Sequence, residues 1–234
     1  MNSLSKISRL GISAVFMGAA MFMSSCSKEE AQAPEPRIDL TSDLNDLDGN
    51  AKINDLAPSI PQTAGLACKG CQAVGWTNSN WNANVPTGTS TSTSLWGIAP
   101  WIKALRGNDE TASFITTSAI EYAGGGARSY VDATIKNLTP GKTYAINVLI
   151  STTKTWDTDY VKSAILTITH FNLAPVNYFE TNFHGKTGQW IPQTIVFKAV
   201  ADKAKLGFGV NVAGANVTGY ANISVGPNAI KQLD

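Results

Sequence analysis

Residues 129–151 read SYVDATIKNLTPGKTYAINVLIS, and this stretch decides the fold. Apolar residues alternate with polar ones on both sides of Pro140-Gly141, which is the period of two that is typical of a half-buried strand. Proline fixes φ and glycine adopts turn conformations that a Cβ disfavours, so the pair predicts a tight turn. We therefore predict two antiparallel strands that are joined by this turn.

Further strand-like segments follow residue 111. The predicted strands are residues 112–119, 129–136, 142–151, 160–171, 189–199, 205–212 and 219–225. Gly124-Gly125-Gly126 and Ala213-Gly214 predict breaks between strands, and no amphipathic helix longer than a turn or two is visible. This spacing predicts an all-β domain, an antiparallel β-sandwich or jelly roll that is closed by Trp-rich strands earlier in the chain.

The first 30 residues predict export and a lipid anchor. The apolar stretch within residues 1–25 is short for a membrane helix, which needs roughly 20 apolar residues. Residues 23–26, MSSC, resemble the cleavage box of a bacterial lipoprotein signal, in which Cys26 becomes the lipidated first residue; an ordinary signal peptide is the alternative. Residues 27–30, SKEE, resemble the tag of surface-exposed lipoproteins of the Bacteroidetes. The resemblance implies a lipid-anchored protein of the outer membrane that faces outward, with a periplasmic orientation left open.

Composition divides the chain into a signal peptide (1–25), a linker rich in Pro, Asp, Asn and Ala (26–61) and a β domain (62–234). Residues 1–25 hold two of the 18 basic residues and none of the 17 acidic ones, so the remainder carries 16 minus 17, or one negative charge. A chain without a basic cluster gains little from phosphate contacts, which argues against nucleic acid as a partner. In an oxidising exterior, Cys68 and Cys71 predict a disulfide.

Three stretches resemble jelly-roll carbohydrate-binding modules with the galactose-binding-like fold. They are residues 138–144, LTPGKTY, similar to a hairpin of these modules; residues 189–199, QWIPQTIVFKA, similar to a strand that Trp190 opens with its ring in the core; and residues 203–209, KAKLGFG, similar to the next strand. The resemblance covers residues 76–228 and implies a β-sandwich that binds a glycan. These modules commonly carry an Asp-Asn pair in the closing strand. Only Asn222 is present here, which puts in doubt the structural calcium ion that the pair would help hold; we predict no cofactor, with a structural calcium ion as the alternative.

Aromatic and acidic side chains are the candidate ligand-binding residues. Sugar rings offer C–H faces that stack on flat aromatic rings, so exposed tryptophan is expected at a glycan site. Residues 154–160, KTWDTDY, form a polar, turn-like segment in which the tryptophan should stay accessible and the carboxylates could bind hydroxyl groups. For any single tryptophan, a place in the core is the alternative. The candidates are Trp156, Asp157, Asp159, Tyr160, Trp76, Trp81, Trp96 and Trp101, with Tyr178 as a further member.

Two other functions are alternatives to glycan binding. A glycosidase needs two carboxyl groups that face each other, and Glu121, Asp132 and Glu180 are isolated in the sequence, so we predict no enzymatic activity. His170 and His184 lack the spacing of metal ligands. A structural or adhesive surface domain that binds a protein would use the same aromatic residues. Exposed rings along a groove beside Asn, Asp or Gln would favour a glycan, whereas a flat or convex apolar patch would favour a protein.

Overall fold

The computed structural model describes residues 57–79, 85–107, 112–122, 125–171, 173–213 and 218–234. All of them belong to one compact unit, residues 52–234. The predicted signal peptide, Cys26, Trp81 and most of the predicted linker lie outside the described residues. Ser59, inside the predicted linker, already forms a β-bridge with Lys136. The described residues contain no helix that is long and apolar enough to cross a membrane.

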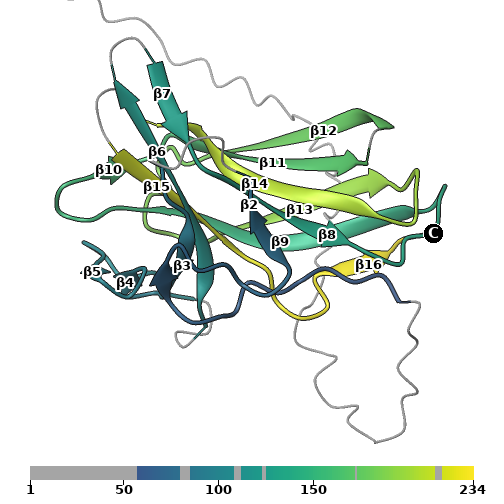
Figure 1. The fold of residues 1–234 in the computed structure, drawn as a ribbon, viewed down its shortest axis with the longest axis horizontal. Coiled ribbons are helices and arrows are strands. Elements are labelled where there is room, and N and C mark those ends of the chain that lie inside the picture. The colour runs from purple at the N-terminus through teal and green to yellow at the C-terminus, as the bar shows by residue number, and fades with distance from the viewer. Residues whose placement is uncertain (1–56, 80–84, 108–111, 123–124, 172, 214–217) are drawn as a thin grey trace, which may run out of the picture. The chain divides into compact units, whose positions relative to one another are not determined.

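Two sheets packed face to face form the domain, and no α-helix occurs in the described ranges (Figure 1). The larger sheet has nine strands: β1 (Cys68–Lys69), β3 (Gly88–Ser90), β6 (Phe114–Tyr122), β15 (Thr218–Ser224), β9 (Thr143–Thr153) and β13 (Ile191–Lys198) in that order, with β7 (Gly125–Arg128) beside β6, β10 (Asp159–Tyr160) parallel to β15, and β16 (Ile230–Gln232) beside β9. The smaller sheet has the order β12 (Leu173–Asn182), β11 (Ser163–His170), β14 (Ala204–Val212), β8 (Tyr130–Ile135) and β2 (Trp76–Asn78). A ribbon of β4 (Ser94–Leu95) and β5 (Ala99–Pro100) completes the domain. The predicted antiparallel β-sandwich is confirmed.

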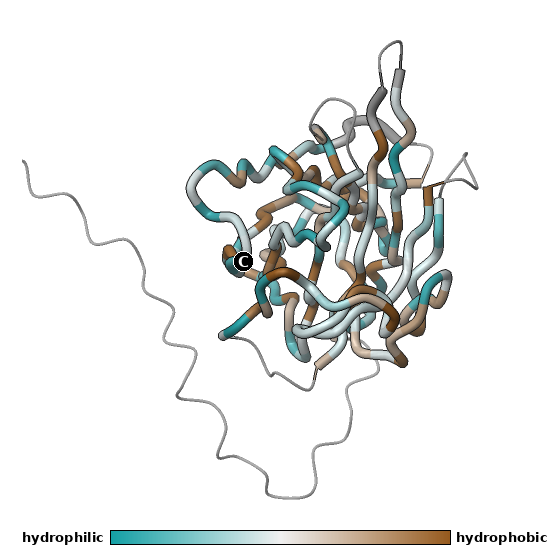
Figure 2. Tube along the Cα trace, turned by 90° about the vertical axis from the view of Figure 1, so that its left-hand side faces the viewer, coloured by the Kyte–Doolittle hydropathy of each residue, from teal (hydrophilic) through white to brown (hydrophobic). Residues whose placement is uncertain are grey.

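The alternation of the sequence places one face of each central strand in the core. In β8 every second residue from Val131 to Ile135 is buried and the residues between them are half-buried. The four inward residues of β14, from Ala204 to Val210, are likewise buried. Figure 2 shows hydrophobic and hydrophilic residues alternating along the strands. Burial of these side chains between the sheets is the main stabilising contribution to the fold.

The two strands of residues 129–151 do not pair with each other, so the prediction of a hairpin is wrong. β8 pairs with β14 and β2 in the smaller sheet, whereas β9 pairs with β13, β15 and β16 in the larger one. The turn between them crosses from sheet to sheet over the buried side chain of Leu138, and Gly141 supplies the required φ of 88°. The turn after β13 runs beside it: the N–H groups of Leu138 and Gly141 donate to the carbonyls of Asp202 (2.9 Å) and Ala199 (2.7 Å).

Three other predicted boundaries differ from the structure. Gly125 and Gly126 do not simply separate strands, because they open β7, which pairs with β6. Residues 160–171 are not one strand: β10 joins the larger sheet and β11 the smaller. β12 was not predicted because it contains Pro175, which weakens a strand pattern. The proline is tolerated because β12 is an edge strand of the described sheet.

Two local features hold loops and strands of the larger sheet together. The predicted disulfide between Cys68 and Cys71 is confirmed, and it closes the loop that follows β1. Asn222, which is fully buried in β15, accepts a hydrogen bond from Thr116 (2.8 Å) and donates to Ser151 (3.0 Å) and Thr153 (2.9 Å). The single amide therefore links β6, β15 and β9, and its polar atoms are satisfied by hydroxyl groups.

Candidate functional site

The structure separates the candidate tryptophans into buried and exposed side chains. Trp76, Trp96 and Trp101 are 4%, 4% and 6% exposed, whereas Trp156 is 81% exposed. A buried ring has no free face for a sugar in this conformation, so the first three are left out of the candidate site. Trp190, expected in the core, is half-buried with its ring edge-on to Phe114 at 5.0 Å.

Trp96 and Trp101 form a small apolar cluster that supports the loop of Trp156. Both rings pack edge-on against Tyr220, at 5.7 and 5.8 Å between ring centroids. Tyr220 lies in β15, next to Tyr160 of β10 in the register of the sheet. In Figure 1, β10 and the β4–β5 ribbon lie at the same end of the sandwich. The two buried tryptophans thus contribute to the site from beneath, as packing.

A turn stabilised by hydroxyl groups presents the Trp156 ring to solvent. The N–H of Thr155 donates to the hydroxyl of Thr158 (2.8 Å), and the hydroxyl of Thr155 donates to the carboxylate of Asp157 (2.7 Å). Thr155 itself is buried, which anchors the turn. Outside this turn, the N–H of Ile102 donates to the carbonyl of Lys154 (2.9 Å). The indole is therefore exposed on a backbone with defined local geometry.

The other predicted residues of the loop surround Trp156 with hydrogen-bonding groups. The hydrogen bond from Thr155 lowers the pKa of Asp157, whose exposed carboxylate stays ionised at neutral pH. Lys154 lies 3.9 Å from the carboxylate of Asp159 and 5.2 Å from the centre of the Tyr160 ring. The structure thus brings four candidates together on one loop, and they offer a stacking surface beside hydrogen-bond acceptors.

The tyrosine beneath this loop predicts a loss of stability in alkali. Burial raises the pKa of Tyr220 to about 12, and the charge of Asp157 adds to the effect. In the unfolded chain this tyrosine loses its proton near its ordinary pKa of about 10, so above that pH the unfolded state binds fewer protons than the folded state. The stability that this raised pKa contributes is complete below the pKa of the tyrosine in the unfolded chain. It is lost as pH rises toward the pKa of the tyrosine in the folded protein. In urea unfolding at a series of pH values, the wild type should lose stability more steeply across this interval than Tyr220→Phe. Equal slopes would show that Tyr220 titrates normally.

A second aromatic surface covers the outer face of the smaller sheet, and it includes Tyr178, which the sequence analysis grouped with the Trp156 candidates. Tyr130 lies over Gly207 and Gly209 of β14: a Cβ at Gly207 would overlap its hydroxyl, and one at Gly209 would lie 2.6 Å from its ring. The Tyr130 hydroxyl makes a hydrogen bond with that of Thr167, and burial raises its pKa. Tyr178 on the edge strand is 67% exposed. Two glycines spaced by two in a strand, as in residues 207–209, are the signal that could have indicated a ring on that face.

Asp132 on this outer face is held in a polar network. Its carboxylate accepts hydrogen bonds from the hydroxyls of Thr77 (2.9 Å) and Ser79, and Lys205 lies 3.3 Å away. Lys205 also lies 5.4 Å from the ring of Phe171. These contacts already engage the carboxylate of Asp132, whereas the ring of Tyr178 stays accessible.

The carboxylates of the smaller sheet are not placed as a glycosidase pair. The register runs from Glu180 through Ile165 and Gly209 to Tyr130, so three strand spacings, or about 14 Å, separate the strands of Glu180 and Asp132. Glycosidase carboxyl groups lie about 5 to 9.5 Å apart. Hydrogen bonds from Ser163 and Asn211 lower the pKa of Glu180, the opposite of what a general acid needs. The side chain of Glu121 lies outside the described part.

No group of three or more His, Cys, Asp or Glu side chains within the described ranges is placed to hold a metal ion. No protein-family model matches the sequence, and no curated protein matches it.

Several solved structures are similar in fold. The enzymatically active domain of tailspike protein 4 from bacteriophage CBA120 has a TM-score of 0.43 and 13% identity over 68% of this chain, which spans 20% of that chain. TmCBM61 in complex with β-1,4-galactotriose has a TM-score of 0.40 and 10% identity over 68% of this chain and 88% of that one. A xylan-binding domain from CBM 22 has a TM-score of 0.40 and 11% identity over 75% and 97%. The similarity is one of fold.

Proposed function

We propose that this protein binds a carbohydrate without cleaving it, at the loop that carries Trp156. The observation that carries the proposal is an indole that is 81% exposed at a turn fixed by hydroxyl hydrogen bonds. Tryptophan is enriched at binding surfaces, and binding residues are concentrated on loops, so an exposed indole on this loop suits a binding site. A sugar ring would stack on the indole, and its hydroxyl groups would donate to Asp157.

The charges of the loop favour an uncharged glycan. Asp157 and Asp159 are both exposed, and the pKa of Asp157 is lowered, so the loop keeps negative charge at neutral pH. Lys154 balances one of these charges through its contact with Asp159. Anionic glycans, such as those rich in uronic acid, would be repelled by Asp157. We therefore expect neutral polysaccharides to be preferred.

The proposal includes a cellular location for the domain. Residues 1–25 would direct export as a lipoprotein signal, lipidated Cys26 would anchor the chain in the outer membrane, and the linker that precedes Ser59 would extend the domain from the membrane surface. The sequence supports this part. A glycan-binding domain on such a linker would hold a polysaccharide at the cell surface.

A panel of polysaccharides tests the proposed function. In affinity gel electrophoresis, the purified protein should be retarded by at least one neutral polysaccharide, and much less by polygalacturonate or alginate. The same incubations should release no reducing ends, because Glu180 and Asp132 lie on strands about 14 Å apart, beyond the separation of a glycosidase pair. Release of reducing ends would contradict a purely binding role.

A protein-binding, adhesive surface domain is the second candidate. Ile98, 71% exposed, and Ile102, 37% exposed, lie in the segment that packs beneath the Trp156 loop and give it an apolar surface. Such residues suit contact with a protein better than contact with a sugar. Retention on none of the polysaccharides would favour this candidate.

A further inference from the structure

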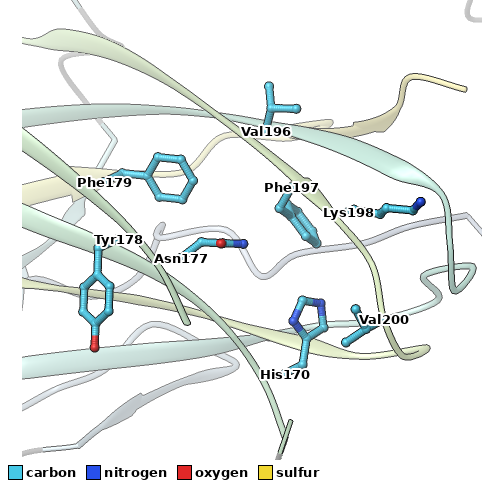
Figure 3. A pocket seen from close by; sticks show the side chains of 8 residues that line it. All are labelled: His170, Asn177, Tyr178, Phe179, Val196, Phe197, Lys198 and Val200. Atoms are coloured by element: carbon cyan, nitrogen blue, oxygen red, sulfur yellow. The ribbon is translucent and has the colours of Figure 1, made fainter. Parts of the chain in front are cut away.

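A pocket of about 570 Å³ opens between β12 and β13, the edge strands of the two sheets (Figure 3). Its size falls within the range of small-molecule sites, about 300 to 1,000 Å³. Phe179 and Phe197 provide apolar walls, and His170 and Asn177 provide the polar groups. The pocket shares no residue with the Trp156 loop, so its occupant is a separate question from glycan binding.

His170 is a buried polar side chain whose ring nitrogens have no partner among the described residues. It is 3% exposed, and neither Nδ1 nor Nε2 makes a hydrogen bond with the described part of the chain. In Figure 3 the imidazole points toward Phe197, whose ring centre lies 6.1 Å away. Most buried polar side-chain atoms in proteins are hydrogen-bonded, so this pair of nitrogens requires an explanation. Burial lowers the pKa of His170, and the neutral ring offers one donor and one acceptor.

Asn177 adds a second uncharged polar group to the same space. Figure 3 shows its amide directed between Phe179 and Phe197. Its amide, like the imidazole of His170, is uncharged and can both donate and accept a hydrogen bond. Lys198, the cation among the lining residues, extends away from this space in Figure 3. The interior therefore combines two aromatic rings with two neutral groups that can each donate and accept.

We propose that this pocket binds a small uncharged molecule that carries an aromatic or alicyclic ring and one hydroxyl group, of which phenol is the simplest example. The ring would pack against the half-buried ring of Phe179, where stacked or edge-on contacts are favourable. The hydroxyl would either donate to the imidazole and accept from the Asn177 amide N–H, or donate to the Asn177 carbonyl and accept from the imidazole N–H, which gives one His170 nitrogen a partner. A carboxylate fits less well, because the interior offers it no cation.

The probe for this proposal is 4-fluorophenol, with fluorobenzene as the analogue without the hydroxyl. In the protein labelled with ¹³C-histidine, 4-fluorophenol should shift the His170 signal saturably. The chain contains two histidines, so exposed His184 is the control in the same spectrum and should not move. From ¹⁹F spectra, fluorobenzene should bind at least about tenfold more weakly, because it lacks both hydrogen bonds of the hydroxyl. An unmoved His170 signal, or equal affinities for the two probes, would overturn the proposal.

Two variants test the roles of the polar groups. His170→Phe and Asn177→Ala should each weaken 4-fluorophenol binding about tenfold while leaving fluorobenzene binding nearly unchanged. Asn177 is half-buried, so its variant keeps the test valid if His170→Phe fails to fold. Trp156→Ala should bind 4-fluorophenol as the wild type does, because that residue is not in the pocket. A folded Asn177→Ala protein with unchanged selectivity for the hydroxyl would contradict the assignment of Asn177.

Discussion

Trp156→Ala should abolish retention of the protein on any polysaccharide that the wild type binds. The side chain is 81% exposed, so it contributes almost nothing to the core, and its whole face is available to a ligand. Loss of a tryptophan at the centre of a binding site commonly costs about 2 kcal/mol or more, which is roughly a 30-fold loss of affinity. Affinity electrophoresis and calorimetry would measure the loss. The free energy of unfolding should change by less than about 0.5 kcal/mol.

Tyr178→Ala is the matched control for this substitution. Tyr178 is also exposed, at 67%, but it lies on the outer face of the smaller sheet. There it is close enough to Tyr130 to contribute to the raised pKa of that residue. If the Trp156 loop is the site, Tyr178→Ala should retain binding. The reverse pattern, with binding lost in Tyr178→Ala and kept in Trp156→Ala, would move the glycan site to the sheet face.

Trp76→Ala should have the opposite effect and destabilise the domain strongly. Trp76 is 4% exposed in the main core, and its Nε1 donates to the carbonyl of Pro61 (3.2 Å). Replacing a buried tryptophan by alanine removes its transfer free energy and leaves a cavity, for a cost of about 3 to 5 kcal/mol. Urea unfolding would measure this loss, and it approaches the total stability of many domains of this size.

The same substitution at Trp156 provides the internal comparison for stability. One tryptophan-to-alanine change should remove stability, and the other should remove binding. A loss below about 1 kcal/mol for Trp76→Ala would show that its ring is not enclosed in the core, since large-to-small substitutions in cores rarely cost so little.

The sequence located most strands but not the sheets to which they belong. Sequence alternation in residues 129–136 and 142–151 predicts two strands, and a hairpin and a crossing between sheets both satisfy that pattern; in the structure β8 alternates in burial, whereas β9 is buried along most of its length. The strand predicted over residues 160–171 is likewise two strands, which are separated at Val161 and Lys162. β10 pairs in the larger sheet and β11 in the smaller one, and a local pattern does not distinguish this arrangement from one continuous strand. Pairing depends on strands far along the chain, and a local pattern does not contain that information.

The candidate site was predictable where it depends on a loop and unpredictable where it depends on long-range packing. The polar segment around Trp156 indicated an exposed ring from its own composition. Burial of Trp96 and Trp101 depends on Tyr220, more than a hundred residues further along, so nothing near them in the sequence distinguishes them from an exposed tryptophan. His170 and Asn177 line the same pocket because β11 pairs with β12. This pairing was not predictable, because Pro175 weakens the strand pattern of β12.

The late position of two central strands in the sequence determines when the domain can fold. β14 lies between β11 and β8 in one sheet, and β15 lies between β6 and β9 in the other, so both sheets are completed by residues 204–224. Most of the chain must be synthesised before its central strand pairs can form, and such long-range pairing makes folding slow. A nascent chain that is still unfolded when its last strands emerge is also one that can be threaded through a membrane before it folds.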